Sequence, residues 1–121
     1  MSCYFQVEEY EVWNPSNSVA RLFLQQATSI SELVDHPSGL CEIIEDECEI
    51  DPRTFSSFVD AIASTYQATN NEVLKSLIEG FASVASVLVE RINGAAPSRR
   101  PELSEVWACR QAALSRSMPK D

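Results

Sequence analysis

Two short runs of strand-forming residues open the chain, one on each side of Glu8-Glu9. Tyrosine, phenylalanine, valine and tryptophan favour extended backbone, so residues 1–13 predict a short β-hairpin or one bent strand. Glu8-Glu9 has neither the glycine nor the asparagine that a tight turn prefers. Asn14 to Asn17 are turn and helix-capping residues, which predicts that a helix starts there.

Apolar residues then recur at spacings of three and four, the period of a helix with one buried side. The first such segment covers residues 17–35 and ends before Pro37, because proline disfavours helical geometry in the residue that precedes it. The second begins at Asp51-Pro52, where aspartate is a capping residue and proline is favoured at the first helical position. Its predicted buried positions are Phe55, Phe58, Val59, Ile62 and Tyr66.

The longest periodic run extends to Asn93-Gly94, a typical helix end. Small residues accompany the apolar ones, so we expect this helix to be central and covered on two sides. A homodimer built on its small residues is compatible with this pattern. Its predicted core positions are Val73, Leu74, Leu77, Ile78, Phe81, Val84, Ala85, Leu88, Val89 and Ile92.

The last part of the chain predicts a linker at residues 94–101 and a helix at residues 102–117 that docks on the core. The apolar positions of that helix are Leu103, Val106, Trp107 and Leu114. The expected fold is therefore mainly α, with a short N-terminal β-hairpin followed by about four helices packed around a central long helix. A chain of 121 residues suits a single domain, residues 1–121.

Residues 39–51 fit two patterns. In an extended segment Glu45, Glu47, Glu49 and Asp51 share one side, whereas in a helix Glu42, Glu45, Asp46 and Glu49 do. The sequence leaves strand or helix open for residues 40–50. Both patterns place the acids outside and the isoleucines inside.

Charge is the most distinctive property of the chain. The net charge is −9, and residues 1–51 hold eleven acids against the single base Arg21. Binding to free nucleic acid or to an anionic membrane depends on lysine and arginine, so we expect neither as a partner. A basic protein is the partner that such a surface fits.

The sequence also bears on location and redox state. No run approaches the roughly 18 apolar residues that span a bilayer, and the N-terminus does not have the pattern of a signal peptide, so we expect a cytoplasmic protein. The four cysteines have no C-x-x-C spacing and are interpreted as reduced and mostly buried. Cys48, between two glutamates, is predicted to be a poor nucleophile.

Several phrases together resemble a known family: YFQV…VWNPSN, VARLFL, DECEID…FVDAI and LIEGFASVASVLVER. They are similar to an uncharacterised family of small actinobacterial proteins that share WNPSN and DEC-x-ID phrases. The family has no known activity, so the resemblance implies no catalytic residues. It implies that residues 1–93 form the shared unit.

The candidate partner-binding residues are the acids of the middle segment, Glu42, Glu45, Asp46, Glu47, Glu49 and Asp51. This segment has neither the glycine nor the alternating ligands of a calcium loop, so we expect no metal site and no cofactor. With His36 as the single histidine and no recognisable triad, no catalytic residue is predicted.

Two functional hypotheses follow. The first is a small acidic, non-enzymatic interaction protein, immunity-like or accessory and regulatory, that engages a basic partner through residues 42–51. The second is a small-molecule-binding protein or biosynthetic enzyme with an apolar pocket between hairpin and helices. That pocket would be lined by Trp13, Asn14 and Tyr66 and would contain a buried carboxylate such as Asp60 or Glu79.

Overall fold

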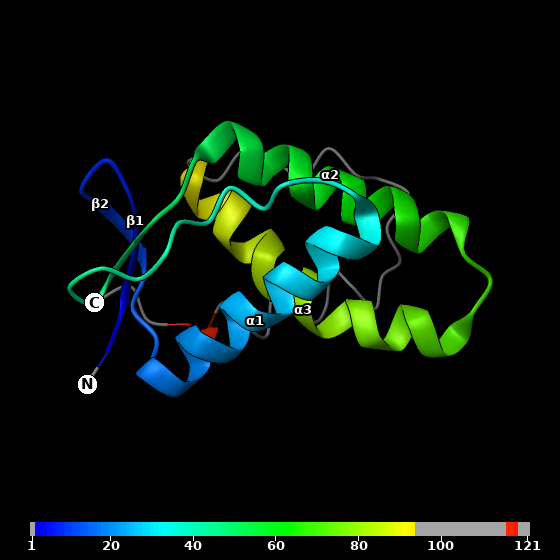
Figure 1. The fold of residues 1–121 in the computed structure, drawn as a ribbon, viewed down its shortest axis with the longest axis horizontal. Coiled ribbons are helices and arrows are strands. Elements are labelled where there is room, and N and C mark those ends of the chain that lie inside the picture. Colours follow the sequence, from blue (N-terminus) through cyan, green and yellow to red (C-terminus); the bar gives the residue numbers. More distant parts are fainter. Residues whose placement is uncertain (1, 94–115, 119–121) are drawn as a thin grey trace.

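The computed structural model describes residues 2–93 and 116–118. In chain order the elements are β1 (Tyr4–Val7), β2 (Tyr10–Trp13), α1 (Asn17–Val34), β3 (Glu47–Glu49), α2 (Pro52–Ala68) and α3 (Glu72–Ile92). The predicted hairpin and the first three helices are confirmed. The predicted linker at 94–101 and most of the predicted helix at 102–117 lie outside the described residues. In Figure 1 the sheet lies at one end of the molecule, and the turn between α2 and α3 lies at the other.

Helix boundaries follow the capping residues that the sequence offers. The Ser16 hydroxyl accepts a hydrogen bond from the Val19 amide at 3.3 Å, and the Asp51 carboxylate accepts one from the Thr54 amide at 3.2 Å. The Asn71 side chain accepts from both the Val73 and Leu74 amides. Each cap satisfies amides that have no partner inside the helix. The first helix ends at Val34, with Asp35 as its left-handed cap, one residue earlier than predicted.

The sheet has the strand order β2-β1-β3. Strands β1 and β2 form an antiparallel hairpin, whereas β3 pairs with β1 in parallel. The turn of the hairpin consists of Glu8 and Glu9, both with positive φ (48° and 76°). Two residues with positive φ match the right-handed twist of a tight hairpin, which explains why the turn forms without glycine.

Residues 39–51 fold back on themselves and are extended where they join the sheet. The Asp51 amide donates to the Gly39 carbonyl at 2.8 Å, and the Cys41 amide donates to the Glu49 carbonyl at 3.0 Å. Glu45 and Asp46 form a second tight turn, again with positive φ (53° and 64°). This turn ends the outward and inward alternation, so the prediction that all isoleucines are inside was wrong. Ile50 is buried, whereas Ile43 and Ile44 are exposed.

The core is a continuous set of aromatic side chains. Phe5 and Trp13 from the sheet lie 5.1 Å apart, and each contacts Phe23 of α1 edge to face. Phe23 stacks on Phe81 of α3 at 4.7 Å, and Phe81 contacts Phe58 of α2. Sheet and helices are therefore joined through one apolar cluster, which stabilises the fold by removing aromatic surface from water.

Helix α3 is buried unevenly along its length, which its sequence does not suggest. Phe81 and Leu88 are buried as predicted, but Val73 and Leu77 are 69% and 72% exposed, which corrects their assignment to the core. Both lie in the first two turns of α3, whereas the longest buried run of this helix is residues 85–89. The small residues Ala82, Ser83, Ala85 and Ser86 are buried within the chain.

Arg91, near the end of α3, connects three parts of the molecule. Its guanidinium donates to the Val12 carbonyl on β2 at 2.8 Å and to the Met118 carbonyl at 2.7 Å. Met118 is itself buried at 5% exposure. Charged hydrogen bonds of this kind are among the stronger polar contacts in proteins, so α3, β2 and residue 118 are firmly linked.

Candidate functional site: an acidic face of the sheet

The register of the sheet gathers carboxylates from strands that are distant in sequence. Gln6 on β1 pairs with Glu11 on β2 and with Glu49 on β3. Paired residues in neighbouring strands point to the same side of a sheet, so these three side chains form one row. Phe5 and Cys48, the adjacent pair in β1 and β3, are both buried, so that row lies on the outer side.

A second outer row consists of Tyr4 on β1 and Glu47 on β3, which also pair. Glu47 and Glu49 are exposed, while Glu11, Tyr4 and Gln6 are half-buried. We refer to Glu11, Glu47 and Glu49 as the acidic sheet face. Tyr4 and Gln6 of β1 lie on the same side of the sheet, and Gln6 lies between Glu11 and Glu49.

Acidic turns lie at both ends of this face. Glu8-Glu9 follows the C-terminal end of β1, and Glu45-Asp46 lies at its N-terminal end, where the Tyr4 amide donates to the Asp46 carbonyl at 2.8 Å. We refer to these pairs as the acidic turns. Glu8, Glu9, Glu45 and Asp46 are all exposed, so the charge of the acidic turns is turned toward solvent.

The six acids nominated from the sequence are all exposed, but they do not all have the same surroundings. Glu47 and Glu49 belong to the acidic sheet face, and Glu45 and Asp46 form the turn beside it. Glu42 is exposed before that turn. Asp51 is different, because its carboxylate caps α2 and is therefore already engaged in structure.

Sequence reasoning missed Glu11 and gave Glu8-Glu9 no role in binding. The alternation Tyr10-Glu11-Val12-Trp13 could have placed Glu11 on the side opposite Val12, which is fully buried. What the sequence could not give is the parallel pairing of β1 with β3. That pairing brings residue 11 into one row with residue 49.

An unusual backbone property marks the acids of these turns. The non-glycine residues with positive φ in the described chain are Glu8, Glu9, Asp35, Glu45 and Asp46, and every one is acidic. Glycine and asparagine adopt this conformation at lower cost than glutamate does. At four of these positions the acidic turns therefore hold carboxylates that a glycine or asparagine would replace with less backbone strain.

The residues nominated for a pocket have separate surroundings. Trp13 is 3% exposed and lies in the aromatic core against Phe5 and Phe23. Asn14 is half-buried, and its side-chain oxygen is enclosed without a hydrogen-bond partner among the described residues. Tyr66 donates its hydroxyl proton to Glu79 at 2.5 Å, which ties α2 to α3.

The carboxylates suggested for that pocket also differ from each other. Asp60 is exposed, whereas Glu79 is half-buried and holds the Tyr66 hydroxyl. The Lys75 ammonium lies 5.3 Å from the centre of the Tyr66 ring. Lys75 is on the same side of α3 as Glu79, because the two residues are four positions apart. These contacts explain Glu79 as a polar link between two helices.

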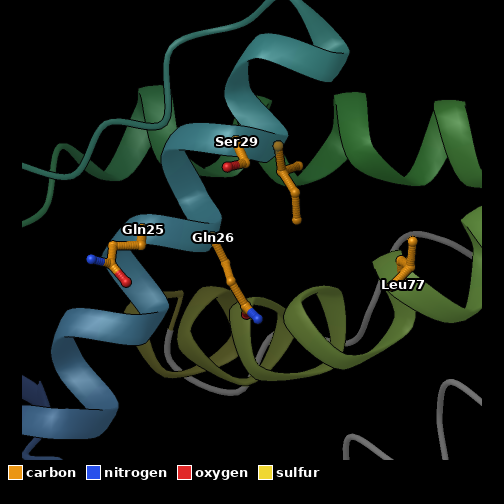
Figure 2. Close-up of a pocket in the computed structure, with 5 residues that line it drawn as sticks. Gln25, Gln26, Ser29 and Leu77 are labelled. Carbon is orange, nitrogen blue, oxygen red and sulfur yellow. The ribbon is translucent and has the colours of Figure 1, made fainter.

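A groove lies between α1 and α3, away from the residues nominated for a pocket. It has a volume of about 240 Å³ and is lined by Gln25, Gln26, Ser29, Ile30 and Leu77. Figure 2 shows Gln26 projecting from α1 toward α3, with Leu77 across the hollow. The lining carries no acid and no base, so it offers no group for proton transfer.

The thiols confirm the expectation for Cys48. Burial raises the pKa of the Cys48 thiol to about 12, with smaller contributions from Cys3 and Cys41, and Glu49 contributes less than either. Burial rather than the flanking glutamates is therefore the main reason that Cys48 is a poor nucleophile. Cys3 is also buried, while Cys41 is exposed, so burial does not extend to all of them. Cys109 lies outside the described residues.

The described part of the chain has neither a cluster of metal ligands nor a membrane-spanning helix. Among those residues, no group of three or more histidine, cysteine, aspartate or glutamate side chains is arranged to hold a metal ion. None of the helices there has the length and apolar character needed to cross a bilayer.

Comparison with known proteins places the chain in a family. The model of a family of unknown function (DUF6086) matches residues 1–120, and the chain belongs to that family. This agrees with the resemblance to an uncharacterised family. No curated protein and no solved structure matches the chain.

Proposed function

We propose that this protein is a non-enzymatic interaction protein that binds a basic protein partner through the acidic sheet face and the acidic turns. The observation that carries the proposal is the presence of glutamate and aspartate at the four turn positions with positive φ. Local rules of backbone preference are broken most often where function requires a particular side chain. Here the side chains that occupy such positions at some cost to the backbone are all carboxylates.

The arrangement of the acids supports the same proposal. Two strands, β2 and β3, present carboxylates on one side of the sheet, and the turns continue that charge at both ends of β1, which lies between them. Complementary charge accelerates the encounter of two proteins and selects against partners of the wrong sign. A rigid sheet also holds the carboxylates in fixed positions, which lowers the entropy lost when the partner binds.

The groove between α1 and α3 does not provide what the alternative hypothesis needs. An enzyme of the kind considered would use a buried carboxylate in an apolar pocket, and the groove lining is made of glutamine, serine, isoleucine and leucine. We favour a binding function because, of the residues nominated for that pocket, Trp13 packs in the aromatic core against Phe5 and Phe23, and Tyr66 is hydrogen-bonded to Glu79.

Charge reversal tests the proposal. A protein captured from extract of the native host by the wild-type chain would be purified and its association rate measured. Glu47→Lys with Glu49→Lys should lower that rate at least tenfold, because both exposed carboxylates then repel a basic partner. The rate for the wild type should also fall with added salt, since screening limits the reach of charge to about 8 Å at physiological ionic strength.

The matched control is Glu32→Lys with Glu72→Lys, which changes the net charge by the same amount at exposed helix positions. This control should keep most of the wild-type rate if the site, and not the total charge, matters. A partner that binds the sheet variant as fast as the wild type, at all salt concentrations, overturns the proposal.

A further inference from the structure

An exposed apolar side chain lies within the most acidic part of the chain. Ile44 is 68% exposed and directly precedes the Glu45-Asp46 turn. The Ile44 amide donates to the Glu47 carbonyl at 2.9 Å, and the Glu47 amide donates to the Ile44 carbonyl at 3.0 Å. Two backbone hydrogen bonds thus hold Ile44 in place at the base of the turn. A residue fixed in this way loses little backbone freedom when a partner covers it.

Ile44 lies on the same side of the sheet as the acidic sheet face. Ile44 and Glu47 form an antiparallel bridge, and Glu47 pairs in parallel with Tyr4 of β1. Paired residues in neighbouring strands point to the same side. Tyr4, Glu47 and Ile44 therefore form one row, with the carboxylate between a phenol ring and an aliphatic side chain. We refer to these three residues as the mixed row.

The mixed row offers three kinds of contact to a basic side chain. The Glu47 carboxylate can accept two parallel hydrogen bonds from a guanidinium. The half-buried ring of Tyr4 can face a cation, and Ile44 offers apolar surface to the methylene groups of a long side chain. Arginine uses all three, because its guanidinium is planar, weakly hydrated and able to stack on an aromatic ring. A lysine ammonium is compact and strongly hydrated, so it gains mainly from the carboxylate.

We infer that the mixed row binds an arginine side chain of the basic partner. This inference rests on the proposed function and adds to it the type of residue that the partner presents. The net charge of −9 favours a cationic occupant. Among the described residues, no group of three or more acidic, histidine or cysteine side chains is arranged to hold a metal ion. The apolar neighbours of Glu47 then select arginine over lysine.

The other outer row provides for further basic residues of the same partner. Glu49 follows Glu47 by two positions on β3, and Glu11 lies beyond Gln6 in the row of Glu49. Alternate residues of a strand are roughly 7 Å apart on one side. An extended partner segment with arginine at alternate positions has the same spacing, so it can pair with Glu47 and Glu49 together. A protein segment therefore uses this surface more fully than a single small cation does.

Two synthetic peptides of equal charge test the inference on the full chain. One alternates arginine with serine, and the other has lysine at each arginine position. NMR titration at about 10 mM salt, where charge acts over about 30 Å, measures both dissociation constants. The arginine peptide should bind about threefold more tightly, the gain expected from contact with an exposed aromatic ring, and should shift the amide signals of Ile44 and Glu47.

Variants of the two apolar neighbours test whether the mixed row is the source of this preference. Ile44→Ser and Tyr4→Leu should each weaken binding of the arginine peptide and leave that of the lysine peptide within about twofold, as expected when no lysine contact is lost. The matched control is Leu77→Ser, because Leu77 is 72% exposed but lies on α3. This control should keep the full preference for arginine. Circular dichroism checks that each variant is folded.

The possible outcomes distinguish this inference from the proposed function. Equal binding of the two peptides, with shifts at Glu47 and Glu49, overturns the arginine preference but leaves the acidic sheet face as a binding surface. Two peptides that shift no residue of the sheet count against both. An arginine preference that persists in Ile44→Ser and in Tyr4→Leu assigns it to another part of the molecule, which also overturns the inference.

Discussion

Cys48 links packing at a single residue to the stability of the protein at alkaline pH. Its pKa is about 12 in the folded protein against an ordinary value of 9.0, and burial is the first cause. Between these two values the unfolded chain loses the thiol proton while the folded chain keeps it, so ionisation favours unfolding. This group's contribution to stability is therefore complete below about pH 9 and is lost as pH rises toward 12.

We predict that the free energy of unfolding falls less between pH 9 and pH 11 in Cys48→Ala than in the wild type. Urea denaturation at several pH values in this interval measures the difference. Other groups titrate in the same range, so the comparison is between the two slopes and not between absolute stabilities. Identical slopes would mean that the Cys48 thiol ionises as easily in the folded protein as in the unfolded chain.

Glu45 and Asp46 lower the stability of the fold, whereas the buried Cys48 thiol raises it below about pH 9. Each of the two turn residues adopts a backbone conformation that favours glycine or asparagine. Glu45→Asn with Asp46→Gly should increase the free energy of unfolding by about 1 kcal/mol, because the backbone strain relieved at two left-handed positions exceeds the extra entropy that glycine gives the unfolded chain. The same change should slow association with a basic partner, since two negative charges are removed from the edge of the acidic sheet face. Chemical denaturation and association kinetics on one variant test both.

A variant that is no more stable than the wild type would show that the two carboxylates impose no backbone cost. The main observation behind the proposed function would then be lost. A variant that is more stable but associates as fast as the wild type would show that the partner contacts the acidic sheet face and not the Glu45-Asp46 turn.

At the scale of elements, the contact between α1 and α3 depends on stacked rings. Phe81 is 3% exposed, stacks on Phe23 at 4.7 Å and also contacts Phe58. Phe81→Ala should lower the free energy of unfolding by roughly 3 to 5 kcal/mol, the usual cost of removing a buried aromatic ring. Leu77→Ala, one helical turn earlier but 72% exposed, should change it by less than about 1 kcal/mol. Similar losses in the two variants would contradict the assignment of Phe81 to the core and Leu77 to the surface.

The elements also show what the sequence determines on its own. The helix beginning at Asp51-Pro52 was predictable because capping, proline position and periodicity all agree locally, and the five positions predicted to be buried are buried. The structure of residues 39–51 was not predictable from the sequence. Their strand of three residues is defined by pairing with β1, a contact that no local pattern specifies. Val73 and Leu77 were misplaced for a related reason. Periodicity identifies an apolar side of a helix but not how much of its length another element covers.

For the candidate site, the sequence supplied the acids and the structure supplied their grouping. The exposed carboxylates of residues 42–49 were recognisable from composition alone. That Glu11 joins them follows from strand order, and that Asp51 serves α2 follows from its hydrogen bond to Thr54. A charge pattern in one dimension therefore identifies a surface only after the fold has sorted structural acids from free ones.

At the scale of the whole molecule, the position of Arg91 has a consequence for aggregation. An exposed strand edge with free backbone groups is a template on which other chains can add strands. Strand β2 is an edge of this sheet, and the Arg91 guanidinium occupies its Val12 carbonyl. On the other edge, residues 39–41 hydrogen-bond to the segment that contains β3. Solubility at high concentration therefore depends on one arginine side chain as well as on the acidic surface, because a chain without it would offer an unprotected strand to its neighbours.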